Sequence, residues 1–328
     1  MREDEECPFG GWSPPGYTVG ADGKVAGARP GTPNNWGRWG EDDQRGTANL
    51  LTAERARHAA ALVQTGETFS LGLPLGHRAE APGTRPQVQH LFMRTPGDHL
   101  LGDPGPAGVQ SADDIVVLPL QASTQLDGHA HVAGGDVLYN GFWAGLVTAH
   151  SGARRLGIHH QAAGIVGRGV LLDVAGVHGI DPYESPIDAA KLDATAAAQA
   201  VRVERGDILL VRTGYLGRWL AAPQERRRRR QSGLTADTIG WLADRDVAMV
   251  AADNAAVEAV PDPAGGRGAL PFHVAALRDL GLLLGELFDL DALAEACAAD
   301  GRYEFLFTAA PLPLVNGVGS PLNPLVMR

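Results

Sequence analysis

Gln125, Asp127, His129 and His131 are polar residues spaced two apart along one short segment. In an extended strand alternate side chains share one face, so all four are expected to project to the same side. Imidazole nitrogens and carboxylate oxygens are the usual ligands of Zn²⁺ and Mn²⁺. The spacing therefore predicts a divalent-metal site formed by these side chains. A polar strand that satisfies its own hydrogen bonds is the alternative.

A second pair of candidate residues, His273 and Glu286, lies much later in the chain. Glu286 falls within the apolar run LLLGELFDL, where burying a carboxylate is costly without a partner or a metal. We therefore expect both residues to join the metal ligands, and to act with His131 as catalytic groups that orient a bound water or move its proton. A helix-capping or core role is the alternative for His273.

Short β-type runs alternate with helical stretches along most of the chain. Strands are expected at 115–123, 124–132, 169–176, 207–214, 247–254 and 306–314, and helices at 187–201, 234–244 and 287–299. A further helix is expected after Thr52, whose side chain can cap it. Because no Pro/Ser-rich linker separates two blocks, the pattern favours one α/β domain with a mixed sheet. Residues 1–35, rich in Gly and Pro, are expected to form an N-terminal arm, and residues 36–328 the catalytic domain.

Composition argues against several classes of function. The net charge of −10 disfavours a nucleic-acid partner, which needs clustered Lys and Arg, and the arginine run at 226–230 is expected to be a solvated face. No stretch approaches the roughly 20 apolar residues of a membrane span. The two cysteines, Cys7 and Cys297, do not indicate a disulfide framework, so a cytoplasmic location is expected. The motifs of serine-triad hydrolases and nucleotide enzymes are absent.

Several blocks of sequence together resemble one enzyme family. They are WGEDD at 39–43, RGTAN at 45–49, STQLDGHAHV at 123–132, YNG at 139–141, RGVLLDV at 168–174, GDILLVRTG at 206–214 and the segment 253–258. In their order and spacing they are similar to the cyclase family that includes bacterial kynurenine formamidase and isatin hydrolase. The resemblance implies a swivelling β/β/α-type fold, a homodimer or homotetramer, and hydrolysis of a C–N bond that depends on Mn²⁺ or Zn²⁺.

Small members of that family carry H-x-G-T-H-x-D, with a further histidine four residues on. Laid over this chain, only His129 is identical, and Gly135 stands at the place of the last histidine, the family's usual proton carrier. A longer subgroup has a segment like TQWDxLxH followed by YNG. There Gln125, Asp127 and His131 match, which makes this subgroup the closer resemblance.

The remaining site residues follow from the same resemblance. The family's downstream histidine and glutamate correspond to His273 and Glu286. Trp39, Tyr139 and Asn140 lie in matching blocks and are expected to contact the substrate. Tryptophans such as Trp39 suit an aromatic-lined pocket, although core packing is the alternative for most of them.

The resulting prediction is a metal-dependent hydrolase that cleaves a C–N bond of an amide, formamide or lactam in a small molecule through metal-activated water. Two other functions stay open. One is a cyclase or dehydratase of natural-product (polyketide-like) biosynthesis that uses acid–base chemistry. The other is a non-catalytic small-molecule binder that keeps the fold without the metal.

Overall fold

The computed structural model describes residues 15–75, 85–102, 109–222, 230–263 and 270–328. Cys7, the first 14 residues of the expected N-terminal arm and the arginine run up to residue 229 lie outside the described residues. The structural role expected for that arginine run therefore stays a prediction.

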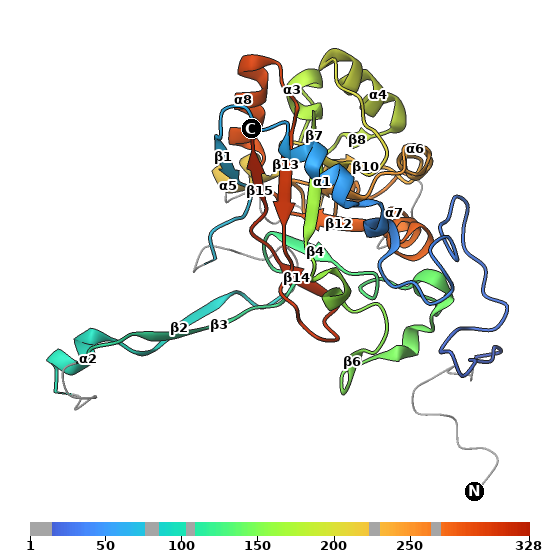
Figure 1. Ribbon diagram of the computed structural model, residues 1–328, viewed down its shortest axis with the longest axis horizontal. Helices are drawn as coiled ribbons and strands as arrows, with labels where there is room; N and C mark the ends of the chain where they lie inside the picture. Colours follow the sequence, from blue (N-terminus) through green and yellow to red (C-terminus); the bar gives the residue numbers. More distant parts are fainter. Residues whose placement is uncertain (1–14, 76–84, 103–108, 223–229, 264–269) are drawn as a thin grey trace, which may run out of the picture.

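A nine-stranded mixed sheet forms the centre of the protein and curls along its length into a half-barrel (Figure 1). Its strands, in spatial order, are β1 (Thr68–Ser70), β15 (Leu325–Met327), β13 (Glu304–Ala309), β7 (Ile165–Asp173), β9 (Ile208–Arg212), β11 (Met249–Ala252), β12 (Leu283–Glu286), β4 (Gln125–Asp127) and β14 (Gly319–Pro321). The strands β7, β9, β11 and β12 run parallel, and the other neighbours pair antiparallel. The prediction of one α/β domain with a mixed sheet is confirmed.

Helices cover both faces of the sheet, because its central strands are apolar on both sides. Along β7, Leu171 faces one core cluster while Val170 and Leu172 face the other. The first face is covered by α1 (Ala53–Ala60) and α8 (Asp291–Asp300). The second is covered by α3 (Val174–His178), α4 (Ala189–Ala198), α6 (Thr238–Asp244) and α7 (Pro271–His273), which continues as the π-helix η6 (Val274–Leu280).

Shorter elements decorate this core. They are η1 (Gly46–Leu50), η2 (Tyr139–Gly141), η3 (Ala144–Leu146), η4 (Ile158–Gln161), α5 (Tyr215–Ala221), and the strand pairs β8 (Pro186–Ile187) with β10 (Gly233–Leu234) and β5 (Val147–Thr148) with β6 (Gly152–Ala153). A separate hairpin of β2 (Gln89–Arg94), α2 (Pro96–Leu100) and β3 (Asp113–Val117) leaves the body (Figure 1). Among the described helices, none has the length and apolar character that crossing a membrane requires.

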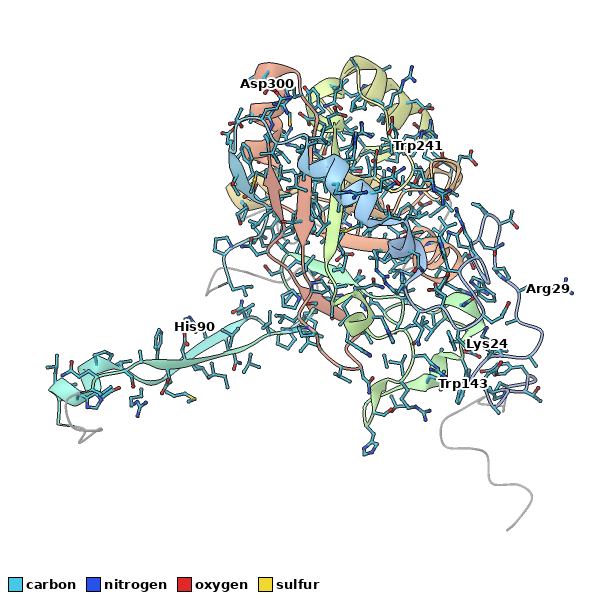
Figure 2. All side chains as sticks on the ribbon, viewed as in Figure 1. Lys24, Arg29, His90, Trp143, Trp241 and Asp300 are labelled. Atoms are coloured by element: carbon cyan, nitrogen blue, oxygen red, sulfur yellow. The ribbon has the colours of Figure 1, made fainter. Side chains whose placement is uncertain are left out.

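The described part of the N-terminal segment, residues 15–35, lies against the chain around Trp143. The Trp143 amide donates to the Gly23 carbonyl at 2.9 Å, and isolated β-bridges join Lys24 to Phe142 and Val19 to Val25. Figure 2 shows Lys24 and Trp143 close together on this side of the body. The segment contains no helix within residues 15–35, in keeping with its Gly and Pro content.

Most predicted elements appear with shifted ends. The helix α1 begins after Thr52, whose hydroxyl accepts the Arg55 amide as expected for a cap. The strand expected at 169–176 ends at Asp173, because that carboxylate accepts the Gly176 amide and starts α3. β13 stops at Ala309, before the prolines of the sequence PLPL, which offer no N–H to a neighbouring strand.

The strand expected at 124–132 is much shorter than predicted. β4 ends at Asp127, where its pairing with β12 and β14 also ends. The chain then turns: the Gly128 amide donates to the Val318 carbonyl, and the His131 amide donates back to the Gly128 carbonyl at 2.9 Å. The strand alternation that was expected to continue through His129 and His131 therefore stops at Asp127.

Candidate metal centre

Asp127, His273 and Glu286 converge into one buried group. One possible ligand atom from each lies within 4.8 Å of the other two. Gln125 and Glu286 are direct cross-strand partners between β4 and β12, and Asp127 lies two residues further along β4, so their side chains share the face that η6 covers. His273 reaches them from the end of α7, which Pro271 opens at its first position. Asp127, His273 and Glu286, which are far apart in the sequence, thus lie close together in space, as predicted.

Gln125 links the two carboxylates of this group. Its amide nitrogen donates to Glu286 Oε2 at 2.7 Å and to Asp127 Oδ1 at 3.3 Å. Its carbonyl oxygen Oε1 and the second oxygen of Asp127, Oδ2, are buried with no hydrogen-bond partner among the described residues. Buried polar atoms are almost always paired, so these two oxygens are free to accept a hydrogen bond or to bind a cation.

Glu258 holds the ring of His273 from the opposite side. Its carboxylate contacts Nδ1 of His273 and accepts the backbone amides of His273 (3.3 Å) and Phe272 (3.2 Å). Glu258 is fully buried. Because Nδ1 of His273 contacts Glu258, the other ring nitrogen, Nε2, faces the group. Nε2 lies 3.3 Å from Glu286 Oε1. Carboxylates set the orientation of metal-binding imidazoles in this way.

The sequence analysis missed Glu258, which entered only as the end of the resembling segment 253–258. A local signal exists, because Glu258 lies between Val257 and Ala259 in the apolar run AAVEAV, and a carboxylate in an apolar run is the pattern that singled out Glu286. Its burial at 0% exposure and the bridge that joins it to Leu234 are seen in the fold.

The electrostatics of the group favour an added positive charge. Burial raises the pKa of Asp127 to about 6, and the negative charge of Glu286 acts in the same direction. Burial acts to lower the pKa of His273, but the carboxylates of Glu258 and Glu286 outweigh it and raise that pKa to about 10. Three buried carboxylates thus surround a single imidazole, and a divalent cation would offset this excess of negative charge.

The two histidines of the turn after β4 point to different places. His131 Nε2 lies 3.8 Å from Asp127 Oδ1, and its side chain is 22% exposed. His129 turns away: its Nδ1 lies 3.3 Å from the Gln44 carbonyl, and its ring centroid is 5.4 Å from that of Tyr139. Burial lowers the pKa of His129 to about 4, so its imidazole is neutral. His131 thus borders the group, and His129 is outside it.

Two of the residues expected to contact substrate hold a neighbouring loop. Asn140 accepts the Gly37 amide and donates to the carbonyls of Gly40 and Glu41, and the Tyr139 hydroxyl donates to Asp43 Oδ2 at 3.2 Å. These bonds tie the loop 37–43 to η2.

Trp39 is the third of those residues. The guanidinium carbon of Arg38 lies over its indole, 4.8 Å from the ring centroid. It lines a surface cavity of about 480 Å³ together with Asn49 and Arg55. Substrate contacts of Trp39, Tyr139 and Asn140 stay predictions.

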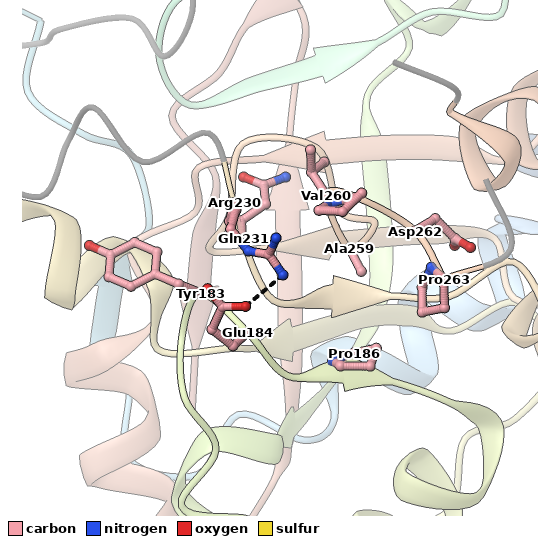
Figure 3. Close-up of a pocket in the computed structure, with 10 residues that line it drawn as sticks. Tyr183, Glu184, Pro186, Arg230, Gln231, Ala259, Val260, Asp262 and Pro263 are labelled. Carbon is pink, nitrogen blue, oxygen red and sulfur yellow. Dashed lines mark ion pairs between the residues drawn. The ribbon is translucent and has the colours of Figure 1, made fainter. Parts of the chain in front are cut away.

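A second cavity lies behind the segment that carries Glu258. It measures about 360 Å³, and its lining includes Tyr183, Arg230 and Val260 (Figure 3). In Figure 3 the Arg230 guanidinium points at Glu184, its ion-pair partner at 2.6 Å. None of the three convergent residues lines this cavity. It is therefore separate from the candidate metal centre.

Together, the fold and the site define an α/β protein with a buried Asp/His/Glu group at the junction of β4 and β12. The family model described as "Putative cyclase" matches residues 54–259, and the chain belongs to this cyclase family. The resemblance stated from the sequence is thereby confirmed. A solved structure described as a novel cyclase is 39% identical, with a TM-score of 0.84 over 90% of this chain and 99% of its own.

More distant solved structures share the fold. Isatin hydrolase A from Labrenzia aggregata, bound to benzyl benzoate, is 18% identical with a TM-score of 0.58 over 82% of this chain and 95% of its own. Isatin hydrolase A from Ralstonia solanacearum is 20% identical with a TM-score of 0.55 over 84% of this chain and 95% of its own. Among curated protein sequences, none matches this chain.

Proposed function

We propose that the protein is a metal-dependent hydrolase that cleaves the C–N bond of a small amide, formamide or lactam. The observation that carries the proposal is the buried group of Asp127, His273 and Glu286 with an unpaired carboxylate oxygen. Such an arrangement does not stabilise the core, because each unpaired buried charge costs folding free energy.

The donor set fits a divalent cation. One imidazole nitrogen and carboxylate oxygens, with the bare Oε1 of Gln125 beside them, are typical ligands of Zn²⁺ or Mn²⁺. Asp127, His273 and Glu286 would hold the ion. A bound cation would supply Lewis acidity, which polarises a carbonyl and makes a water acidic enough to attack near neutral pH.

The chain's own residues then have separate tasks. Glu258 fixes the ring of His273, and Gln125 fixes the carboxylates of Asp127 and Glu286. His131 is partly exposed and lies beside Asp127. We therefore propose that it takes a proton from water and delivers it to the leaving nitrogen. This gives His131 the proton-carrying task for which Gly135 has no side chain.

The substrate class is supported by the distant structural relatives. Two of them are isatin hydrolases, and a further isatin hydrolase is bound to the product analogue thioisatinate. Isatin is a lactam fused to an aromatic ring. An aromatic lactam or formamide is therefore the substrate class that we propose for this chain.

The test combines metal analysis with a substrate panel. Protein purified without chelator is analysed for Mn and Zn and assayed with N-formyl arylamines, cyclic imides and isatin-like lactams. We expect about one ion per chain and turnover that a chelator abolishes. In Asp127→Asn both are lost, whereas Asp253→Asn, a change at a buried aspartate outside the group, keeps the ion.

Two outcomes would contradict the hydrolase. Turnover by metal-free protein would favour an acid–base cyclase or dehydratase. Tight binding of a panel compound without metal or turnover would favour a small-molecule binder.

A further inference from the structure

Gln121 lies on the turn that leads into β4, and its side-chain amide nitrogen has no hydrogen-bond partner among the described residues. The turn is closed by the Ala122 amide, which donates to the Pro119 carbonyl at 3.1 Å. The nitrogen Nε2 of Gln121 is buried, although the side chain as a whole is only partly buried. A buried N–H group without an acceptor costs free energy, so its presence in a native protein needs an explanation.

The glycine opposite Asp127 shows where this amide lies. β14 lies beside β4 (Figure 1), and Gly319 on β14 is the direct cross-strand partner of Asp127. Cross-strand partners share a face, so a Cβ at Gly319 would project to the side of Asp127, roughly 5 Å from the Asp127 Cβ. That Cβ would lie 2.6 Å from Nε2 of Gln121. The Gln121 amide therefore fills the space over Gly319, on the same face as the candidate metal centre.

The unpaired atoms on this face differ in chemistry. Oε1 of Gln125 and Oδ2 of Asp127 are acceptors, which can bind a cation. Nε2 of Gln121 is a donor, which can only be satisfied by a further acceptor. An amide, formamide or lactam has a carbonyl oxygen with two lone pairs. The proposed reaction thus brings to this face the kind of atom that Gln121 lacks.

We propose that Gln121 is a catalytic residue that donates a hydrogen bond to the carbonyl oxygen of the substrate, which rests on the hydrolase function proposed above. When water attacks the carbonyl carbon, an electron pair moves onto the carbonyl oxygen. When the C–N bond breaks, that pair returns to the carbon, and the nitrogen leaves with the bonding pair and takes up the proton that water has lost. The N–H group of Gln121 stays intact and stabilises the oxygen while it carries negative charge.

The arrangement depends on glycine at position 319. A Cβ there would lie 2.6 Å from Nε2 of Gln121 and 3.0 Å from the carbonyl oxygen of Leu126. The Gln121 amide is the end of a flexible side chain, whereas the Leu126 carbonyl belongs to the paired backbone of β4. Gly319→Ala should therefore displace the amide without removing it, which gives a second and independent way to break the same contact.

Isothermal titration of the Mn²⁺-loaded chain with oxindole and with indoline tests the contact without any turnover. The two compounds share a bicyclic frame, but only oxindole has a carbonyl oxygen. Gln121→Ala should weaken the binding of oxindole about 10-fold, the usual worth of one hydrogen bond, and leave that of indoline unchanged. Equal weakening of both compounds, or of neither, would overturn the proposal.

Gln199→Ala is the matched control for this titration. Nε2 of Gln199 is also buried without a partner among the described residues. Its Oε1, however, accepts the Asp173 amide at the end of β7, and two strands separate β7 from β12. Gln199→Ala should therefore bind oxindole as the wild type does, and an equal loss in this variant would also count against Gln121.

Turnover and metal content complete the test. On a lactam that the wild type hydrolyses, Gln121→Ala should lower kcat about 100- to 1,000-fold, the range for loss of one oxyanion donor, with the metal retained. Gly319→Ala should act in the same way, and the double variant should be no slower than Gln121→Ala, because both changes remove one hydrogen bond. Loss of the ion in Gln121→Ala would make Gln121 a metal ligand and overturn the proposal.

The two readouts separate this proposal from the hydrolase function. Full kcat in Gln121→Ala would refute the role of Gln121 and leave the hydrolase in place. A wild type that hydrolyses no member of the panel, but in which the oxindole effect of Gln121→Ala remains, would refute the hydrolase and support the contact between Gln121 and a carbonyl oxygen.

Discussion

Two buried aspartates at the ends of strands, Asp127 and Asp253, show how differently the same side chain is used in this protein. Both are almost wholly buried, and burial raises the pKa of each to about 6. Asp253 is closed by donors: it accepts the amide and hydroxyl of Thr213 at 2.7 Å and the Gly214 amide at 2.8 Å. Asp127 receives one long hydrogen bond from Gln125, and its Oδ2 has no partner among the described residues.

The difference separates a carboxylate whose hydrogen bonds are satisfied from one that we propose binds a metal ion. The donors to Asp253 belong to the turn that follows β9, so this side chain joins two parallel strands at their carboxyl ends. Asp127 instead faces a second carboxylate, Glu286, and an imidazole that Glu258 already holds. A buried carboxylate that accepts all its hydrogen bonds stabilises the fold. A buried carboxylate that lacks them and lies beside another carboxylate favours the binding of a cation.

The largest effect is expected from exchanging the charge of each aspartate. Asp127→Asn should lose the metal and lower kcat/KM more than about 100-fold. That is more than the usual effect of changing a residue that only hydrogen-bonds to a metal ligand. It should not lower the melting temperature, because it removes a poorly paired buried charge. Asp253→Asn should retain the metal but lose about 1 to 3 kcal/mol of stability. Metal content and thermal unfolding of both variants check this, and a metal-replete Asp127→Asn would break the comparison.

An intermediate effect is expected for the carboxylate behind His273. Glu258→Gln should weaken Mn²⁺ binding about 10- to 100-fold. The amide holds the imidazole of His273 less firmly than the carboxylate does, and it leaves the imidazole less basic. Isothermal titration with Mn²⁺ measures this. Glu304→Gln on β13, where the carboxylate pairs with Arg168, is the matched control and should bind Mn²⁺ as the wild type does. Equal affinities for both variants would refute the positioning role.

The pH dependence of stability sharpens the comparison at Asp253. Its folded pKa of about 6 lies above the unfolded value of 3.8, so the folded state binds the proton more tightly. The free energy of unfolding should therefore gain a contribution as pH falls from about 6 towards 4 and lose it above pH 6, where each tenfold difference in proton affinity is worth roughly 1.4 kcal/mol. Urea unfolding at pH 7 and pH 5 should show a wider gap between wild type and Asp253→Asn at the lower pH. An equal gap at both would contradict the assignment.

The smallest effect on the metal is expected at His129. His129→Asn should leave the metal content unchanged and alter kcat less than about 10-fold, because the ring lies against Tyr139 and outside the group. The matched change His131→Asn removes the imidazole beside Asp127 and should reduce kcat by more, within the 100-fold or greater range of general acid–base groups. If His129→Asn lost the metal, the ligand set expected from the sequence, which includes His129, would be restored.

Much of the site was predictable from residue types. An acid within the apolar run around Glu286 and the spacing of Gln125 and Asp127 both pointed to the correct strands, because burial cost and strand periodicity are local properties. The reach of the strand was not predictable. β4 ends at Asp127 because its neighbours end there, and that length depends on segments 319–321 and 283–286, far away in the sequence.

The sequence by itself determined the α/β class, the membership of the cyclase family and the identity of three convergent residues, Asp127, His273 and Glu286. Those features follow from patterns of a few residues each. Only the tertiary structure decided that His129 turns away, that Glu258 holds His273, and that the hairpin between β2 and β3 stands free. The physical reason is that orientation and burial are set by neighbours in space, which strand pairing brings together and local spacing does not encode.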